Sequence, residues 1–282
     1  MVLGLPALVV YLGFLVGPVL AGFYLSLTQW DGINPPKWIG IDNFVKLAGD
    51  SDYLAALVHT LIFTAIILVG QVGVGLGLAL LLNRAIRGVS FMRGVFFAPA
   101  LMSTAVIALI FGFVYNPVVG VLGRAARALG LGDSLLGNVL GNQWSALVGV
   151  SVVVIWQFVG YMMIIFLAGL KSIPGEIYEA AALDGAGGAR LFWSITWPLL
   201  SPSLSIAVLI SLAGNLKLFD QVYLMTGGGP AGATETVGTL IYKTAFLNSD
   251  YGYSVAQSVV LTLLITFVVV AQRLLMSRTT RT

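Results

Sequence analysis

The chain lacks cysteine entirely and has one histidine, His59, among its 282 residues. Without cysteine it can form no disulfide, thiolate metal site or cysteine nucleophile, and a single histidine makes a histidine-based metal site or catalytic triad unexpected. Charge is also scarce, at 9% of residues against about 25% in a typical soluble domain. The 14 basic and 11 acidic residues are spread over loops. We therefore predict no catalytic residues, no metal site and no nucleic-acid partner.

Apolar residues are abundant, at 59% of the chain, and the mean hydropathy is +0.99. A folded domain cannot hide so much apolar surface from water, so the surrounding solvent is a lipid bilayer. A spanning helix needs about 20 mostly apolar residues, and lipid offers no partner to a bare backbone group. We predict an all-α integral membrane protein, a single domain over 1–282, with the first span uncleaved. Its six predicted transmembrane helices are 3–27, 54–82, 95–114, 144–170, 199–218 and 255–275.

The basic residues are unevenly divided between the two membrane sides. One side, formed by two short loops and the C-terminal tail, carries eight of them: Arg84, Arg87, Arg93, Lys171, Arg190, Arg273, Arg278 and Arg281. The other side carries six over longer loops, together with eight of the eleven acidic residues. Because basic loops favour the cytoplasm, we predict that both termini and the loop between the fourth and fifth spans are cytoplasmic.

That loop, 171–198, contains a short polar segment between two apolar spans. Pro174 suits the first turn of a helix, and Glu176 and Glu179 favour its positive end. The alanines after Glu179 promote helix, and Gly185 stops it. A helix this short is marginal in water, where about 12–15 residues are needed. It is either held by a partner protein or lies as an amphipathic helix at the membrane surface.

The segment EAAALDGAG, followed by Phe192, Ile195, Pro198 and Pro202, resembles the EAA motif of ABC-importer permeases. The residues that match the version found in carbohydrate permeases are Glu179, Ala180, Ala181, Asp184, Gly185 and Ala186. The resemblance implies the type I ABC importer permease fold, with a coupling helix between spans four and five. In that family the helix docks in a groove of a cytoplasmic ATPase and transmits its ATP-driven closure to the spans.

A second match, FDQVYLMTGGGPAGATETVGTLIYKTAF over 219–246, resembles the first of the two permeases in carbohydrate and glycerol-phosphate importers. WDG…WIGIDNFVKL, over 30–47, resembles their first extracytoplasmic loop, so the likeness covers nearly the whole chain. It implies a bacterial cytoplasmic membrane protein whose partners are a second related permease, two copies of an ATPase subunit and an extracytoplasmic solute-binding protein. The segment 219–253 is then an extracytoplasmic loop near the docked binding protein, although an ordinary loop is the simpler reading.

No G-x-x-x-x-G-K-[ST] phosphate loop occurs in the chain, and GGGPAGAT lacks the lysine. The predicted protein therefore has no cofactor of its own, and ATP and Mg²⁺ belong to the partner ATPase subunits. We predict a transporter subunit that works by alternating access and carries out no covalent chemistry. The rival readings are an ion-gradient transporter, a membrane enzyme and a homodimeric permease for another solute class. The first two would want acids or other reactive groups inside the spans, which hold essentially none.

Polar side chains within the spans mark a pathway for solute. Trp156, Gln157 and Tyr161 stand together in the fourth span, where an aromatic ring beside amide and hydroxyl groups suits a sugar. Ser211 and Asn215, four residues apart in the fifth span, share a helix face. The resemblance adds that the counterparts of Tyr161, Ser211 and Asn215 contact sugar in the maltose-type permease. Hydrogen bonds between helices are the alternative for each of these residues.

Three further features receive structural readings. Lys217 and Asp220, three residues apart, favour a local ion pair over a gate or a contact with an anionic solute. For His59 we expect a hydrogen bond or an interface position. The glycine-rich run GQVGVGLG, which starts at Gly70, predicts close packing between helices.

Overall fold

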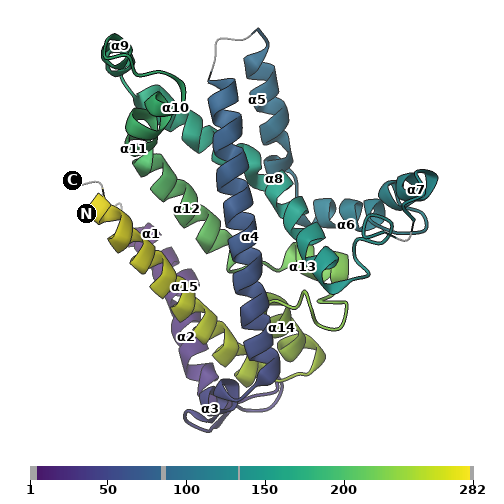
Figure 1. The fold of residues 1–282 in the computed structure, drawn as a ribbon. Helices are drawn as coiled ribbons and strands as arrows, with labels where there is room; N and C mark the ends of the chain where they lie inside the picture. Colours follow the sequence, from purple (N-terminus) through teal and green to yellow (C-terminus); the bar gives the residue numbers. More distant parts are fainter. Residues whose placement is uncertain (1–4, 84–86, 133, 280–282) are drawn as a thin grey trace.

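The computed structural model describes residues 5–83, 87–132 and 134–279. Within those ranges the regular structure is helical apart from one small hairpin, in which β1 (Thr28–Gln29) pairs antiparallel with β2 (Lys37–Trp38). This confirms the predicted all-α class. Four helical stretches are long and apolar enough to span a membrane, and two bent helix pairs bring the possible total to six. The arrangement is compatible with the six predicted spans (Figure 1).

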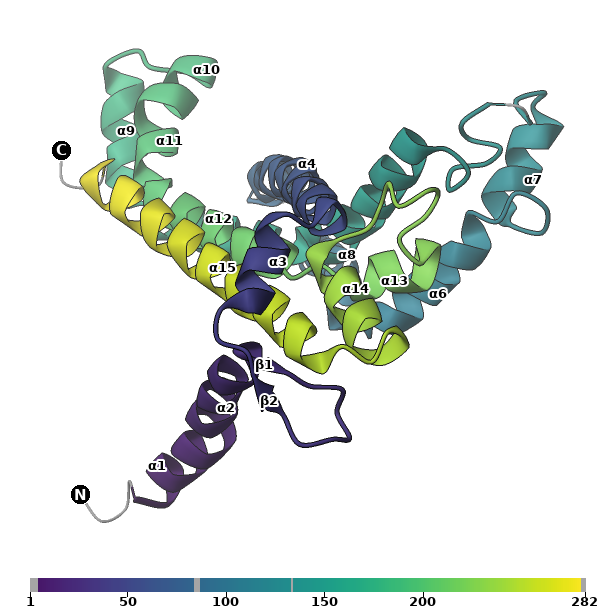
Figure 2. The ribbon, with the colours of Figure 1, turned by 90° about the horizontal axis from the view of Figure 1, so that it is seen from below.

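The first helical stretch stands apart from the rest of the bundle. It consists of α1 (Leu5–Tyr11), one π-helical turn η2 (Leu12–Val16) and α2 (Gly17–Ser26). Only the α2 end contacts the body of the protein, through α15 (Tyr251–Thr279), while the α1 end projects away from it (Figure 2). Phe14, in the middle of the stretch, is 84% exposed. The stretch therefore presents its apolar side chains to its surroundings and not to this chain's own core.

Two long helices form the centre of the fold. α4 (Ser51–Leu82) and α8 (Gln143–Ser172) pack along one another, with Phe63 and Phe166 completely buried. A Cβ at Gly75 would lie 2.7 Å from the Cβ of Met162, too close for any larger residue. The close packing predicted from the glycine run is therefore confirmed at this position, where the missing side chain lets the helices approach.

The predicted third span bends within its length, and a second bend lies at the start of the predicted fifth span. The first bent pair turns by 96° and the second by 67°. Pro99 lies just before the first bend and Pro202 just after the second, and proline removes a backbone donor that a continuing helix needs. The first pair consists of α5 (Val89–Phe97) with the 3₁₀ turn η3 (Ala98–Leu101), then α6 (Thr104–Val114). The second consists of α10 (Gly188–Leu191), η4 (Phe192–Thr196) and α11 (Trp197–Leu199), then α12 (Ser201–Asn215).

Short helices cover the two ends of the bundle. α9 (Gly175–Leu183) caps the end at which α8 finishes (Figure 1). The opposite end carries the hairpin, α3 (Asp42–Ala48), α13 (Asp220–Thr226), α14 (Val237–Tyr242) and the π-helical turn η5 (Lys243–Leu247). α7 (Val121–Ala128) lies at the outer edge of the molecule, beyond α6 (Figures 1 and 2).

Candidate functional site

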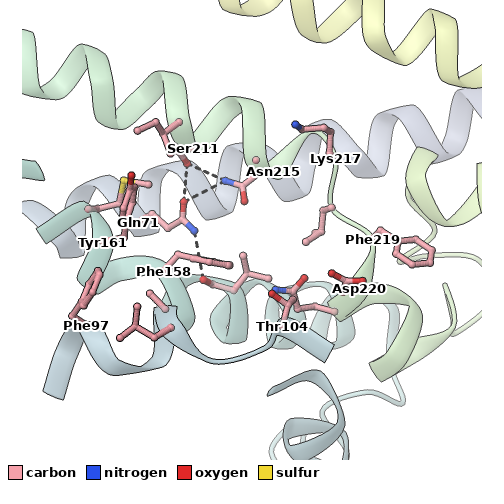
Figure 3. A pocket seen from close by; sticks show the side chains of 18 residues that line it. Gln71, Phe97, Thr104, Phe158, Tyr161, Ser211, Asn215, Lys217, Phe219 and Asp220 are labelled. Carbon is pink, nitrogen blue, oxygen red and sulfur yellow. Dashed lines mark hydrogen bonds between the residues drawn. The ribbon is translucent and has the colours of Figure 1, made fainter. Parts of the chain in front are cut away.

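The main cavity opens between α4, α8 and α12 and is closed on its other sides by the bent α5–α6 pair and α13 (Figure 3). Its volume is about 540 Å³, within the range of small-molecule sites. Aromatic and aliphatic side chains make up most of its wall, with polar groups at two places. The lining residues are Gln71, Phe97, Ala100, Leu101, Thr104, Val154, Phe158, Tyr161, Met162, Ile210, Ser211, Gly214, Asn215, Lys217, Leu218, Phe219, Asp220 and Gln221.

A buried polar network joins α12 to α4 at the cavity wall. The Ser211 hydroxyl donates to Gln71 Oε1 at 2.8 Å, and Asn215 Nδ2 donates to Ser211 Oγ at 2.9 Å. Asn215 Nδ2 also reaches Gln71 Oε1 at 3.4 Å (Figure 3). The predicted shared face of Ser211 and Asn215 is therefore confirmed. Hydroxyl and amide groups that line a cavity in an apolar bundle are suited to exchange these hydrogen bonds for those of a polar solute.

Gln157 does not line the cavity, but its side chain bonds to helices that do. Its side chain is fully buried, and Gln157 Oε1 accepts a hydrogen bond from Gln221 Nε2 at 3.0 Å. Gln157 Nε2 donates to the Met102 carbonyl at 3.4 Å and to Thr104 Oγ1 at 3.3 Å. One amide thus links α8 to α13 and to the start of α6. This geometry matches the alternative reading, in which Gln157 joins helices.

The structure separates Trp156 from Tyr161, although the two were predicted to act together. Tyr161 lines the cavity, whereas the Trp156 ring lies outside it, 5.2 Å from the ring of Phe111. Five residues along an α-helix correspond to about 500°, so the two side chains leave α8 in different directions. Of the predicted solute contacts, the cavity brings together Tyr161, Ser211 and Asn215 and leaves out Trp156 and Gln157.

The predicted ion pair between Lys217 and Asp220 is wrong. Among the described residues, the ion pairs are Lys46–Asp250 and Lys243–Glu235. α12 ends at Asn215 and α13 begins at Asp220, so the intervening residues are not helical and three-residue spacing no longer brings side chains together. Lys217 and Asp220 are instead both exposed at the edge of the cavity (Figure 3).

Sequence reasoning missed Gln71, Thr104 and Gln221, which line the same cavity. Gln71 is the acceptor that both Ser211 and Asn215 use, and only 2% of its surface is exposed. A signal was available, because Gln71 is the one amide within the apolar run from Leu61 to Leu82. Over residues 5–83, 87–132 and 134–279, no group of three or more acidic, histidine or cysteine side chains is placed to hold a metal.

α9 forms a second, quite different candidate site. Its nine residues end in a Schellman motif, in which Ala186 N donates to the Ala181 carbonyl at 2.9 Å and Gly185 N to the Ala182 carbonyl at 3.1 Å. Gly185 has a φ of 73°, a left-handed conformation that glycine adopts without strain. The sequence predicted this helix and its stop correctly, because both signals are local.

One face of α9 packs against the bundle, and the other, which we call the bare face, is exposed. Ile177 and Tyr178 pack against the core cluster around Phe166, and Ala181 is 5% exposed. The opposite face exposes Glu179, Ala180, Asp184 and, at its tip, Leu183, which is 90% exposed. Leu183 was not among the predicted coupling residues, so sequence reasoning missed this exposed leucine. Of the six predicted coupling residues, Ala181 is buried, Ala186 is partly buried and the other four are exposed.

The sequence also matches known proteins along most of its length. Residues 71–281 match the family described as binding-protein-dependent transport system inner membrane component. The multiple sugar-binding transport system permease protein MsmF of Streptococcus mutans is 37% identical over 266 residues, covering 94% of this chain and 90% of that protein. The sn-glycerol-3-phosphate transport system permease protein UgpA of Brucella abortus is 35% identical over 259 residues, covering 91% and 87%.

The fold is shared with a solved transporter. A chain in the crystal structure of a bacterial alginate ABC transporter, in complex with an alginate pentasaccharide-bound periplasmic protein, superposes with a TM-score of 0.85. The match covers 99% of this chain and 93% of that one, at 22% sequence identity. Fold and family agree with the cavity, the bent spans and the exposed short helix described above. This chain belongs to the family of inner membrane components of binding-protein-dependent transport systems.

Proposed function

We propose that the protein is one permease subunit of an ATP-driven ABC importer for a carbohydrate or a glycerol-phosphate-like solute. The observation that carries the proposal is the cavity, where the Gln71–Ser211–Asn215 network faces an apolar wall beside Tyr161. A sugar ring has apolar C–H faces and a rim of hydroxyl groups. Apolar and aromatic wall residues suit the faces, and the side-chain amides and hydroxyl suit the rim.

The importer would need parts that this chain does not contain. A second, related permease forms the other half of the pathway, two copies of an ATPase subunit supply and bind ATP and Mg²⁺, and a solute-binding protein delivers solute. Its relatives support this assignment, since they are named as permeases of sugar and glycerol-3-phosphate transport systems. We place the protein in a bacterial cytoplasmic membrane, with α9 and both termini in the cytoplasm.

α9 is proposed as the coupling helix. Its bare face, which includes Glu179, Ala180, Asp184 and Leu183, is the part that an ATPase groove would receive. Its attached face rests on α8 and the α10–α12 segment, so movement of the ATPase is passed directly to helices that line the cavity. The segment 171–198 then acts as one cytoplasmic loop, and 219–253 lies on the extracytoplasmic side near the docked binding protein.

The experiment is uptake of labelled solute by proteoliposomes that contain both permeases and the ATPase, with binding protein added outside. We expect uptake to require ATP inside, to survive an ionophore, and to fall about tenfold or more when Asn215→Leu removes two hydrogen bonds. The control is Thr262→Val, which alters an exposed polar residue of α15 outside the cavity. Uptake that stops with the ionophore and ignores ATP would establish an ion-gradient transporter instead.

A further inference from the structure

The segment around α7, between the first bent pair and α8, is built as a rigid unit. Asn116 Oδ1 accepts hydrogen bonds from the backbone N–H groups of Val118 and Val119 at 2.9 and 3.1 Å. A Cβ at Gly120 would lie 2.4 Å from the Asn116 carbonyl, so the following helix can pack on this turn only with glycine there. The far end closes in a Schellman motif, with Leu131 N bonded to the Ala126 carbonyl at 2.7 Å.

This rigid unit turns large aliphatic side chains outward. Leu122 packs inward against the cluster formed by Ile107, Tyr115, Val139 and Val153. The outward side chains of Val118, Val119, Val121 and Leu129 are 67%, 63%, 73% and 75% exposed. Val121 is the first residue of α7 and Leu129 is its C-cap, so exposed aliphatic side chains lie at both ends of the helix. We call Val118, Val119, Val121, Arg124 and Leu129 the α7 surface.

The α7 surface is basic. Arg127 Nη2 donates to the Val118 carbonyl at 2.6 Å, which holds the two exposed valines beside the helix. Arg124 is exposed, and its guanidinium makes neither a hydrogen bond nor an ion pair within the part of the chain that the structure describes. The sequence contains no acidic residue between Asp52 and Asp133. An aliphatic face bordered by a free guanidinium is the pattern of a helix that lies in a membrane interface.

The position of α7 fits that pattern. α8 begins shortly after α7, and α9 follows the far end of α8, so a 30-residue helix, about 45 Å long, separates the two short helices. α7 therefore lies at the opposite membrane side from α9, at the edge of the molecule beyond α6 (Figures 1 and 2). No residue of α7 lines the main cavity, so the solute site gives no reason for its exposed valines.

We propose that the α7 surface lies in the bilayer interface opposite α9, with its aliphatic side chains among the acyl chains and Arg124 at a lipid phosphate. Its composition favours lipid over protein. Valine and leucine, which make up its apolar part, are under-represented among the energetic centres of protein interfaces. A basic residue beside an anionic membrane surface contributes about 1 kcal/mol, so phosphatidylglycerol is the preferred headgroup.

The absence of cysteine makes the test direct. Single cysteines at Leu129 and Val121 are labelled with a fluorophore in the full chain, which is reconstituted into phosphatidylethanolamine–phosphatidylglycerol vesicles. Ile33→Cys, in the hairpin and 91% exposed, is the control for water. We expect brominated lipid to quench the α7 labels and aqueous iodide to quench the Ile33 label. Brominated phosphatidylglycerol quenches more than brominated phosphatidylcholine, by up to about fivefold, which corresponds to about 1 kcal/mol.

Two variants separate the charge from the apolar face. Arg124→Gln is expected to abolish the preference for phosphatidylglycerol while lipid quenching remains, and Lys37→Gln, an exposed charge on β2, is expected to leave that preference unchanged. Labels at both Val121 and Leu129 that are quenched by iodide alone would place the surface in water and overturn the proposal. Labels shielded from both quenchers in the assembled importer would show that a partner protein covers it, which would also overturn it.

Discussion

The two ends of the bundle are built in opposite ways. At the end that carries α14, loops and helices are bonded to one another: Thr236 Oγ1 donates to the Leu218 carbonyl at 2.8 Å, and Val237 N to Thr60 Oγ1 at 3.0 Å. A partly buried ion pair joins Lys243 to Glu235 there. At the end that carries α9, the helix rests on an apolar patch and its outer face is exposed.

This difference in internal bonding gives the two ends different mechanical properties. Segments joined by many internal hydrogen bonds resist local opening, so we expect the α14 end to keep one shape. A helix attached along one face and bare on the other can be gripped without disturbing its own fold. The contrast predicts that substitutions at the α14 end reduce stability, whereas those on the bare face of α9 reduce partner binding.

The largest effect is expected from Lys243→Ala. The Lys243 ammonium also donates to the Gly227 carbonyl at 2.8 Å, and its loss leaves Glu235, whose side chain is 14% exposed, without its cation. Breaking such a pair costs about 3 kcal/mol. We expect a clear fall in the Tm of the detergent-purified chain. Lys243→Met combined with Glu235→Gln, which removes both charges, should recover most of the loss. A Lys243→Ala variant as stable as the wild type would contradict the view that internal bonds stabilise the α14 end.

Next is Leu183→Asp on α9. Because Leu183 is 90% exposed, the substitution should leave Tm unchanged, yet placing a charge on the proposed docking face is expected to cost about 2 kcal/mol of binding. We expect affinity for the ATPase subunit, measured by titration in detergent, to fall about 30-fold. The matched control is Leu247→Asp, which alters a leucine 64% exposed at the opposite end. Equal losses in the two variants would mean that the effect is not specific to α9.

A smaller effect is expected from Asp50→Ala at the start of α4. Burial raises the pKa of Asp50, but hydrogen bonds from the Tyr253 hydroxyl and the N–H groups of Tyr53 and Asp52 outweigh it and hold that pKa below its usual value. The variant loses the helix cap, worth about 1 kcal/mol.

The same carboxylate makes the effect depend on pH. A group whose folded-state pKa is depressed stabilises the protein fully above its unfolded pKa, about 3.9, and loses that contribution as pH falls through the folded value. We therefore expect the Tm difference between wild type and Asp50→Ala to be constant near neutral pH and to shrink below about pH 4. Asp50→Asn, which keeps an N-cap acceptor, should retain part of the stability without the acid dependence. A difference that grew on acidification would contradict this account.

The smallest effect is expected from Lys46→Gln. Its ion pair with Asp250 spans 3.2 Å, but both side chains are exposed, at 57% and 37%. Its ammonium also lies 3.8 Å from the centre of the Tyr253 ring. Exposed pairs of this kind contribute about 0.5 kcal/mol, and less in salt. Thermal denaturation should show a small Tm difference between wild type and Lys46→Gln at low salt and none at high salt. A large difference, or one that persists in salt, would contradict this account.

Local patterns account for the parts of the fold that were predicted. Apolar runs located the helical stretches that are long and apolar enough to span a membrane. The stop at Gly185 was predicted because a left-handed glycine ends a helix whatever surrounds it. The bends were not predicted, since Pro99 and Pro202 weaken a helix without setting its direction, which depends on packing against α8. Lys217 and Asp220 were misjudged because the prediction assumed that the helix continued through Leu216.

The cavity shows the same division. Ser211 and Asn215 were predicted to share a face from spacing alone, and they do. Their common acceptor, Gln71, is 140 positions from Ser211 in the chain, so no local pattern could pair them. Trp156 and Gln157 look like solute contacts beside Tyr161 in sequence, but the rotation of α8 turns the tryptophan away from the cavity and the amide into the helix contacts around Gln221.

Composition and local patterns were enough to predict a lipid surrounding, the helical class and a short capped helix between two spans. These follow from composition and from interactions within a few residues, such as the backbone bonds that close α9 at Gly185. Three features follow only from the packing of the whole chain: where the bent pairs turn, which polar groups meet at Gln71, and which faces of α7 and α9 are exposed. Those outcomes depend on contacts between distant segments, whose energies are settled only when the helices are packed together.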